Sequence, residues 1–237
     1  MSKKEEVRTM FDSIAWRYDF LNHLLSFGTD VRWRRKAIDE IASRISPKRI
    51  LDLATGTCDL AIESLRLKPE KVTAIDNSQR MLEEGRKKLY RKKIIDRIEL
   101  MIGDSEELPF DDKSYDAVMV SFGIRNFEDY ESGLAEMYRV LRVDGVVMIL
   151  EFSMPTKFPF KQVYNFYFYR ILPFFGALFS KDKSAYHYLP DSVSAFPEGD
   201  DFLRSMESAG FRDLSRRRLT GGVATIYTGC RKNNIAR

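Results

Sequence analysis

A run of small residues follows an apolar segment near the end of the first quarter of the chain. Residues 50–54 are mostly apolar, Thr55, Gly56 and Thr57 come next, and a helical pattern begins at Cys58. Small residues let the backbone approach a ligand closely, and the N-terminus of a helix presents free N–H groups to polar ligand atoms. We interpret this run as a nucleotide-type loop.

Acidic and hydroxyl side chains recur where the next expected strands end. Asp76 lies twenty residues after Gly56 at the end of the second strand, where a carboxylate can accept both ribose hydroxyls of an adenosine. Asp104 and Ser105 end the third strand and suit the exocyclic amine and ring edge of adenine, and Ser121 ends the fourth. A single aspartate at a strand end is often only a turn former, but the repeated placement favours ligand binding.

The loop also argues against a dinucleotide. A dinucleotide-binding loop needs the pattern G-x-G-x-x-G to hold a pyrophosphate, whereas this loop offers only Gly56. An adenosyl ligand without a pyrophosphate, such as S-adenosylmethionine, fits better. Asp52, one position inside the strand, either steadies the loop or interacts indirectly with the positively charged end of that ligand.

The elements that must position these residues alternate along the chain. Short β-rich runs cover 49–54, 71–76, 98–103, 115–122 and 146–152, and helical patterns cover 58–67, 78–93 and 130–141. Such alternation predicts a parallel sheet with helices on both faces. Two further β-like runs, 211–219 and 223–230, are joined by a Gly-Gly pair and predict a hairpin. We therefore expect an α/β, Rossmann-like, mostly parallel seven-stranded sheet with a C-terminal antiparallel hairpin.

Two segments fall outside the alternation, although we treat 1–237 as one domain. Residues 1–45 look helical, and the insert 155–197 is rich in Phe and Tyr. Ligands of open α/β sheets bind at the carboxyl edge, so we expect both segments to cover that edge. Within the insert, 158–179 is too polar and proline-broken to span a bilayer. Its aromatic rings and basic flanks suit a lid that holds an isoprenoid tail and touches a membrane surface; the structural alternative is a core helix.

Charge and cysteine content exclude several classes of protein. The 39 Lys and Arg residues are dispersed and nearly matched by 35 Asp and Glu, so we expect no nucleic-acid partner. The small positive excess suits an anionic membrane surface. Two cysteines and an N-terminus without a secretory pattern predict a cytoplasmic, reduced protein. No cluster has metal-ligand spacing, so we expect no metal. The basic run 86–93 is interpreted as a solvated helix face, and the oligomeric state is left open, a homodimer included.

Several motifs resemble the UbiE/MenG family of ubiquinone and menaquinone biosynthesis C-methyltransferases over nearly the whole chain. They occupy 10–15 with 18, 19 and 22, then 51–60, 107–110, 121–126, 137–141, 150–153 with 155, 186–189 and 219–224. The resemblance implies a class I methyltransferase fold, S-adenosylmethionine as donor, and C-methylation of a polyprenylated quinol. The loop of this chain has fewer glycines than is usual in the family, because it contains Thr55 and Cys58. At the end of the third strand, this chain has Asp104 where the family usually has Asn.

The resemblance also implies site residues. The cofactor contacts of the family fall on Thr57, Asp76, Asp104, Ser105 and Ser121. For the acceptor, we expect Arg125 and Asn126 to stabilise a quinolate oxygen, the structural alternative for Arg125 being an ion pair with Glu128 or Glu151. Candidate bases for the phenolic proton are Asp19 and His187, although a lone His among tyrosines is often only a hydrogen-bonded neighbour.

The acceptor is expected to be demethylmenaquinol, because the aromatic insert and the pair Gly221-Gly222 look more like the menaquinone members. The alternatives are a ubiquinone-precursor benzoquinol, another lipid acceptor, or a non-catalytic adenosyl-binding scaffold. The expected location is the inner face of the membrane, as a peripheral protein.

Overall fold

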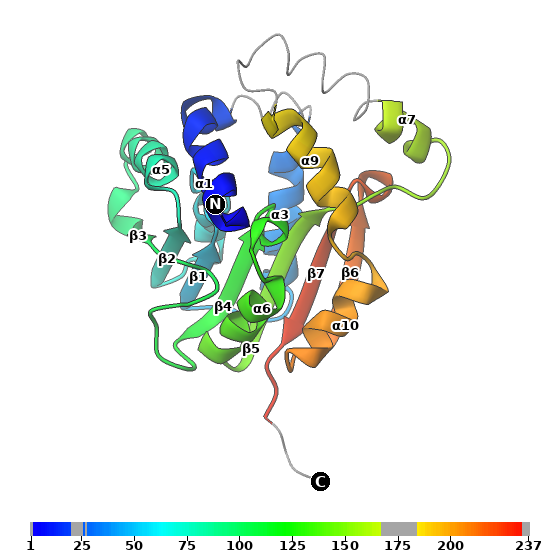
Figure 1. The fold of residues 1–237 in the computed structure, drawn as a ribbon. Coiled ribbons are helices and arrows are strands. Elements are labelled where there is room, and N and C mark those ends of the chain that lie inside the picture. Colours follow the sequence, from blue (N-terminus) through cyan, green and yellow to red (C-terminus); the bar gives the residue numbers. More distant parts are fainter. Residues whose placement is uncertain (1, 20–25, 27, 167–183, 234–237) are drawn as a thin grey trace.

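The computed structural model describes residues 2–19, 26, 28–166 and 184–233, which form a seven-stranded sheet (Figure 1). The strand order is β3-β2-β1-β4-β5-β7-β6. Strands β1 to β5 pair in parallel, and β7 runs antiparallel between β5 and β6. The bounds are β1 Arg49–Leu53, β2 Lys71–Asp76, β3 Ile98–Ile102, β4 Tyr115–Ser121, β5 Leu141–Phe152, β6 Arg212–Leu219 and β7 Ala224–Cys230. The predicted parallel sheet with a C-terminal antiparallel hairpin is confirmed.

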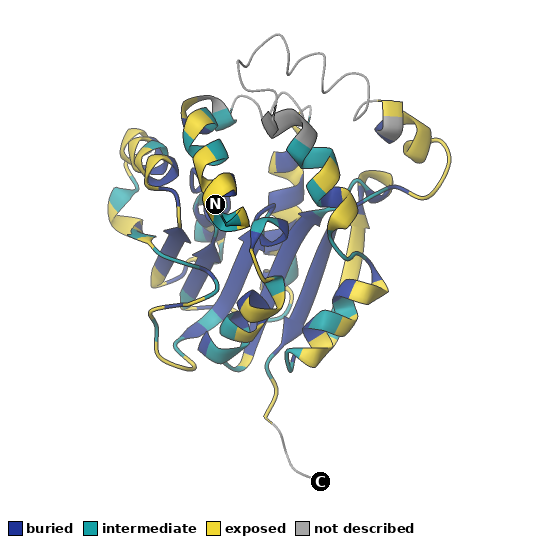
Figure 2. Ribbon diagram, viewed as in Figure 1, coloured by how far each residue is buried: buried dark blue, intermediate teal, exposed yellow. Residues whose placement is uncertain are grey.

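Helices cover both faces of this sheet. One face packs against α3 (Thr29–Ala42), α4 (Asp59–Ser64) and α5 (Gln79–Arg91), and the other against α6 (Tyr130–Val140) and α10 (Asp200–Ser208). Each face of the sheet has its own hydrophobic core, and successive residues of a central strand point into opposite cores. Ile50, for example, lies in one core and Leu51 in the other. Both faces of β1, β4 and β5 are therefore buried, and these strands are dark blue in Figure 2.

The helix after β2 begins where its sequence predicts. The Ser78 side chain accepts a hydrogen bond from Met81 N at 3.0 Å and so caps α5. Met81, Leu82 and Leu89 recur at helical spacing and are buried. Ser78 follows Asp76 so closely that the cap also connects the helix to the end of β2, because Ser78 N donates to Asp76 Oδ1 at 2.9 Å.

Among the described residues, α1 (Lys3–Ile14), the short helix η1 (Ala15–Arg17) that follows it, α7 (Phe160–Phe166) and α9 (Ser184–Ala195) lie beyond the carboxyl ends of the parallel strands (Figure 1). A capping box fixes the start of α1, since Ser2 Oγ accepts from Glu5 N and the Glu5 carboxylate accepts from Ser2 N. Residues 167–183 of the aromatic insert lie outside the described residues. Within the described part of the chain, no helix has the length and apolar character needed to cross a membrane.

Strand limits agree with the sequence expectation to within one residue, except at the start of β5. This strand begins at Leu141, which pairs with Tyr115, five residues before the predicted start. The pairing is irregular between Tyr115 and Ala117, and Asp144 has φ 61°. The strand therefore bends through a segment whose Asp-Gly pair looks like a turn in the sequence, and the helix before it ends at Val140.

Candidate active site

A pocket opens where the chain order of the sheet reverses, between β1 and β4. The backbone is crowded there, because a Cβ atom built on Gly123 would lie 2.7 Å from Ala54 Cβ. Ala54 and Phe122, the residues that follow these two strands, have φ angles of 48° and 56°. Left-handed backbone at non-glycine residues costs about 1 kcal/mol each and is concentrated at ligand sites. Such switch points are where open α/β sheets bind ligands.

Asp76 holds the loop at one end of this pocket. Its Oδ2 accepts from Gly56 N at 2.7 Å and its Oδ1 from Ser78 N at 2.9 Å. Gly56 has φ +56°, a conformation that glycine adopts without strain. Burial raises the pKa of Asp76 to about 6, although these two N–H donors act in the opposite direction. The carboxylate therefore lines the pocket at the place predicted for a ribose acceptor.

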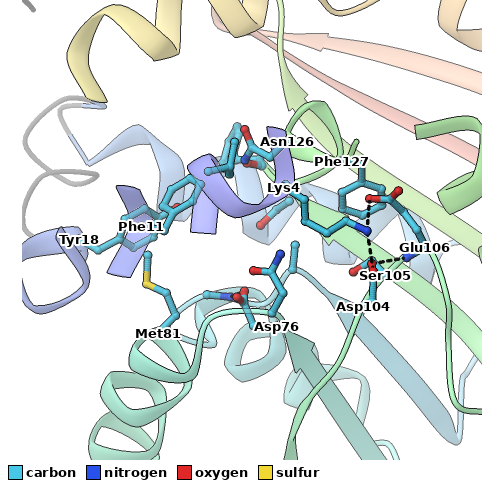
Figure 3. Close-up of a pocket in the computed structure, with 17 residues that line it drawn as sticks. Lys4, Phe11, Tyr18, Asp76, Met81, Asp104, Ser105, Glu106, Asn126 and Phe127 are labelled. Atoms are coloured by element: carbon cyan, nitrogen blue, oxygen red, sulfur yellow. Dashed lines mark hydrogen bonds and ion pairs between the residues drawn. The ribbon is translucent and has the colours of Figure 1, made fainter. Parts of the chain in front are cut away.

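Asp104, Ser105 and Ser121 line the same pocket, as their positions at the ends of strands predict. Lys4 of α1 reaches across the opening, where its Nζ lies 2.6 Å from Asp104 Oδ2 and 3.3 Å from Glu106 Oε1 (Figure 3). The polar end of the pocket is therefore closed by an ammonium group from the N-terminal segment.

Apolar side chains also line the pocket. Four aromatic rings and one thioether from three parts of the chain contribute to its wall, namely Phe11, Tyr18, Met81, Phe122 and Phe127. A flat aromatic base gains both dispersion and hydrophobic free energy against such a surface. The pocket thus combines the Asp76 carboxylate, the polar groups around Asp104 and an apolar side formed by Phe11, Tyr18 and Met81 (Figure 3).

Asp52 lies beneath the cofactor-type loop. Thr55 Oγ1 donates to its Oδ2 at 2.6 Å, whereas its Oδ1 is buried without a hydrogen-bond partner among the described residues. Burial raises the pKa of Asp52 to about 7, and the Thr55 hydroxyl offsets part of that rise. Asp52 therefore steadies the loop through Thr55, and it does not itself line the pocket.

Asp19 and Thr57 contact each other away from the pocket wall. Thr57 Oγ1 donates to Asp19 Oδ1 at 2.5 Å, and Lys88 Nζ lies 2.6 Å from Asp19 Oδ2 and 2.7 Å from Asp59 Oδ1. Neither Asp19 nor Thr57 lines the pocket. The interpretation of 86–93 as a solvated face is wrong for Lys88, which is buried because acidic partners from two other segments surround its ammonium group.

Arg125 and Asn126 form the short helix η4 (Ile124–Asn126) after β4. Arg125 is buried, and its Nη1 donates to Glu151 Oε1 at 2.7 Å and to Phe122 O at 2.6 Å. Burial raises the pKa of Glu151 while Arg125 opposes the rise. The structural alternative for Arg125 is therefore present, with Glu151 as the partner. Asn126 does line the pocket.

His187 belongs to α9, but its side chain lies outside the described residues. Its role as a base stays a prediction. In the described part of the chain, no group of three or more His, Cys, Asp or Glu side chains is arranged to hold a metal ion.

The residues of the pocket fit S-adenosylmethionine. Asp76 offers acceptor atoms for ribose, Asp104 and Ser105 offer polar atoms for adenine, and the apolar wall suits the base. The unpartnered oxygen of buried Asp52 suits a cationic ligand, since a carboxylate without compensation is costly to bury. Fold and pocket together define a class I S-adenosylmethionine-dependent methyltransferase.

Comparisons with known proteins identify the family. Residues 1–231 match the model of the ubiE/COQ5 methyltransferase family. The ubiquinone/menaquinone biosynthesis C-methyltransferase of Citrifermentans bemidjiense is 50% identical over 229 residues, which cover 96% of this chain and 97% of that protein. The demethylmenaquinone methyltransferase of Bacteroides fragilis is 45% identical over 227 residues, covering 95% and 92%. The chain belongs to the ubiE/COQ5 methyltransferase family.

Solved structures share the fold at low sequence identity. An S-adenosylmethionine-dependent methyltransferase from Aquifex aeolicus superposes with a TM-score of 0.60 at 16% identity, covering 84% of this chain and 89% of that one. This chain thus shares its fold with a methyltransferase of known structure.

Sequence reasoning missed residues that reach the site from distant parts of the chain. Lys4 lies 100 positions from Asp104, and Tyr188 Oη donates to Asn126 Oδ1 at 2.9 Å across 62 positions. Lys4 has no local pattern that indicates a ligand contact, whereas Tyr188 lies in the family motif 186–189. Tyr18 also lies in a family motif, and it lines the pocket.

Proposed function

We propose that this protein transfers a methyl group from S-adenosylmethionine to the ring carbon of demethylmenaquinol, giving menaquinol. Relatives at 45–50% identity support C-methylation in quinone biosynthesis, and the names of both kinds of relative include menaquinone. A ubiquinone-precursor benzoquinol is the alternative acceptor, because the first relative is named for both products.

The position of Asn126 is the observation that carries this proposal. Asn126 lines the cofactor pocket, and its amide also contacts α9 of the aromatic insert through Tyr188. A ring held between α9 and Asn126 would therefore lie beside the cofactor, at the carboxyl edge of the sheet. Placing two reactants side by side supplies much of the rate of a transfer reaction.

The residues of the chain have separate tasks in this reaction. When bound, S-adenosylmethionine supplies an electrophilic methyl group on its sulfonium centre. Asp76, Asp104, Ser105 and Ser121 hold the adenosyl part. Asn126 and the cationic Arg125, its neighbour in η4, stabilise negative charge on the acceptor oxygen. This charge makes the neighbouring ring carbon more nucleophilic. Lys4, Val7 and Phe11 of α1 cover part of the pocket.

Asp19 and His187 are the proposed bases for the phenolic proton. Asp19→Asn and His187→Ala should each lower turnover of the quinol by about 10²- to 10⁴-fold if that side chain removes the proton, with the dissociation constant of the cofactor unchanged. Full activity of either variant removes that residue from the mechanism. A loss of cofactor affinity in Asp19→Asn would instead assign it to the contact with Lys88 and Thr57.

Methyl transfer is tested directly with labelled cofactor. Purified protein is incubated in detergent with methyl-labelled S-adenosylmethionine and, separately, reduced demethylmenaquinone or a demethylated benzoquinol, and the rings are analysed by mass spectrometry. Oxidised demethylmenaquinone is the control, because a quinone ring is not a nucleophile. Label on the naphthoquinol alone supports the proposal, and label on the benzoquinol alone selects the alternative. Cofactor binding without label on either ring refutes the quinol assignment.

We also propose that the protein works as a peripheral protein at the inner face of the membrane, which α7 contacts. Phe158, just before α7, and Phe166, at its end, are residues with exposed fractions of 80% and 62%, and Lys157 and Lys161 are exposed near them. Phe160 packs against Gly221 in the β6–β7 turn, which anchors α7 to the sheet. Exposed rings with basic neighbours suit an anionic lipid surface.

Vesicle flotation tests this contact. The double variant Phe158→Ser/Phe166→Ser should bind vesicles containing phosphatidylglycerol about 100-fold more weakly, since burying each such ring contributes about 1.5 kcal/mol. Tyr90→Ser is a matched control, because Tyr90 is also exposed and has basic neighbours on α5. Equal flotation of both variants and the native protein would refute the membrane contact through α7.

A further inference from the structure

The helix α9 brings a phenol group to the wall of the cofactor pocket. Tyr188 Oη donates to Asn126 Oδ1 at 2.9 Å, and Asn126 is a lining residue of that pocket (Figure 3). Tyr188 is half-buried. The pair therefore connects α9 of the aromatic insert to the wall of the cofactor pocket.

Both Tyr188 and Asn126 can form further hydrogen bonds besides the one that joins them. Asn126 Nδ2 has one long contact, 3.4 Å to Phe122 O, so an N–H remains to donate. Tyr188 directs its hydrogen to Asn126, so its oxygen can still accept. A donor and an acceptor side by side match one phenolic hydroxyl, which both accepts and donates.

Buried charges adjoin this pair. Arg125 precedes Asn126 in η4 and forms an ion pair with Glu151, while Arg125 Nε is buried without a partner among the described residues. Burial raises the pKa of Tyr188, and the charges of Arg125 and Glu151 act on it in opposite directions. Tyr188 is therefore protonated at neutral pH, which suits binding and orientation of a hydroxyl and not removal of its proton.

We propose that Tyr188, together with Asn126, binds one ring hydroxyl of the acceptor and thereby determines which ring carbon faces the cofactor. This assignment rests on the proposed function, because it names the residue that recognises the quinol. It explains why the Tyr188 hydroxyl points from the aromatic insert toward the Asn126 side-chain amide, which lines the pocket.

Tyr188→Phe tests the assignment because it keeps the ring and removes only the oxygen. Tyr130→Phe is the matched control, since the Tyr130 hydroxyl contacts Ser205 Oγ at 3.4 Å and does not line the pocket. The substrate probe is reduced demethylmenaquinone with a short prenyl tail. The inhibitor probes are two prenylated naphthols, each lacking a different one of the two ring hydroxyls.

Tyr188→Phe should lower kcat/KM for the quinol by about 5- to 30-fold, as expected for one lost hydrogen bond in a closed site. The dissociation constant of S-adenosylmethionine should stay within twofold. The inhibition constant should weaken for only one of the two naphthols, namely the one that keeps the hydroxyl bound by Tyr188. Tyr130→Phe should match the native protein in every measurement.

Three results would overturn the assignment: unchanged kcat/KM in Tyr188→Phe, equal weakening of both naphthols, or a parallel loss of cofactor affinity, which indicates a structural role. These results require that the native protein methylates the quinol. If the native protein binds the cofactor but methylates no quinol, the proposed function fails and this assignment fails with it.

Discussion

Binding of S-adenosylmethionine is expected to release protons from the two buried carboxylates beside the cofactor loop. Burial raises the pKa of Asp52 to about 7 and that of Asp76 to about 6. A cationic ligand and donating ribose hydroxyls both favour the ionised carboxylate, so binding lowers these pKa values and protons leave. Affinity must therefore rise with pH across this range.

The size of the effect follows from the two pKa values. At pH 7, about half of Asp52 and about a tenth of Asp76 carry a proton, so about 0.6 protons are released per cofactor bound. At pH 6 the release is about 1.4 protons, and at pH 8 about 0.1. If only the doubly ionised form binds, the cofactor binds about 20-fold more weakly at pH 6 than at pH 8.

Isothermal titration calorimetry in phosphate and in Tris measures the proton count, because the two buffers differ in ionisation enthalpy. The amino group of the cofactor titrates near pH 8, so the decisive quantity is the difference between the native protein and Asp52→Asn. That variant should release about 0.5 fewer protons at pH 7. S-adenosylhomocysteine, which lacks the sulfonium charge, should also release fewer. Identical proton counts in the native protein and Asp52→Asn would refute the reasoning.

Three further outcomes follow from the same contacts. The raised pKa of Asp52 favours its neutral form in the folded state, so the folded protein loses stability as the pH rises from about 4 to 7. Asp52→Asn, which stays neutral, should therefore raise Tm at pH 8 but not at pH 4. Equal shifts of Tm at both pH values would contradict this. Lys4→Met should tighten cofactor binding about 1.5- to 5-fold, as a partly exposed ion pair across the pocket is removed, and calorimetry showing weaker binding would contradict it. Glu151→Gln should cost about 3–5 kcal/mol of unfolding free energy in denaturant titration by leaving Arg125 unpaired, whereas the exposed control Glu128→Gln should cost little.

The sheet could be predicted because local pattern and global topology agree. The strand 71–76 matches its predicted limits, since residues 72–75 are β-branched or apolar and the run ends at Asp76. Asp104, Ser105 and Ser121 were placed at the pocket by one argument, that the carboxyl ends of parallel strands meet at one edge. That argument needs no knowledge of side-chain conformation.

The groups that close the site could not be predicted in the same way. Lys4 and Tyr188 belong to helices whose position over the sheet is set by tertiary packing, and no spacing in the chain links either to its partner. Lys88 illustrates the opposite error. It occupies a helix face rich in Lys and Arg, where exposure is the ordinary expectation, but three acceptor groups from elsewhere in the chain surround its ammonium.

This buried ammonium changes how Asp19 should be understood. A general base must offer a lone pair to the substrate, whereas both carboxylate oxygens of Asp19 already face donors, Lys88 Nζ at 2.6 Å and Thr57 Oγ1 at 2.5 Å. Those donors belong to α5 and to the loop after β1, so Asp19 connects the N-terminal segment to both. The same segment contributes Lys4, Phe11 and Tyr18 to the pocket. Asp19 therefore sets the position of the cover in this state, and any role in proton transfer requires that Lys88 first releases it.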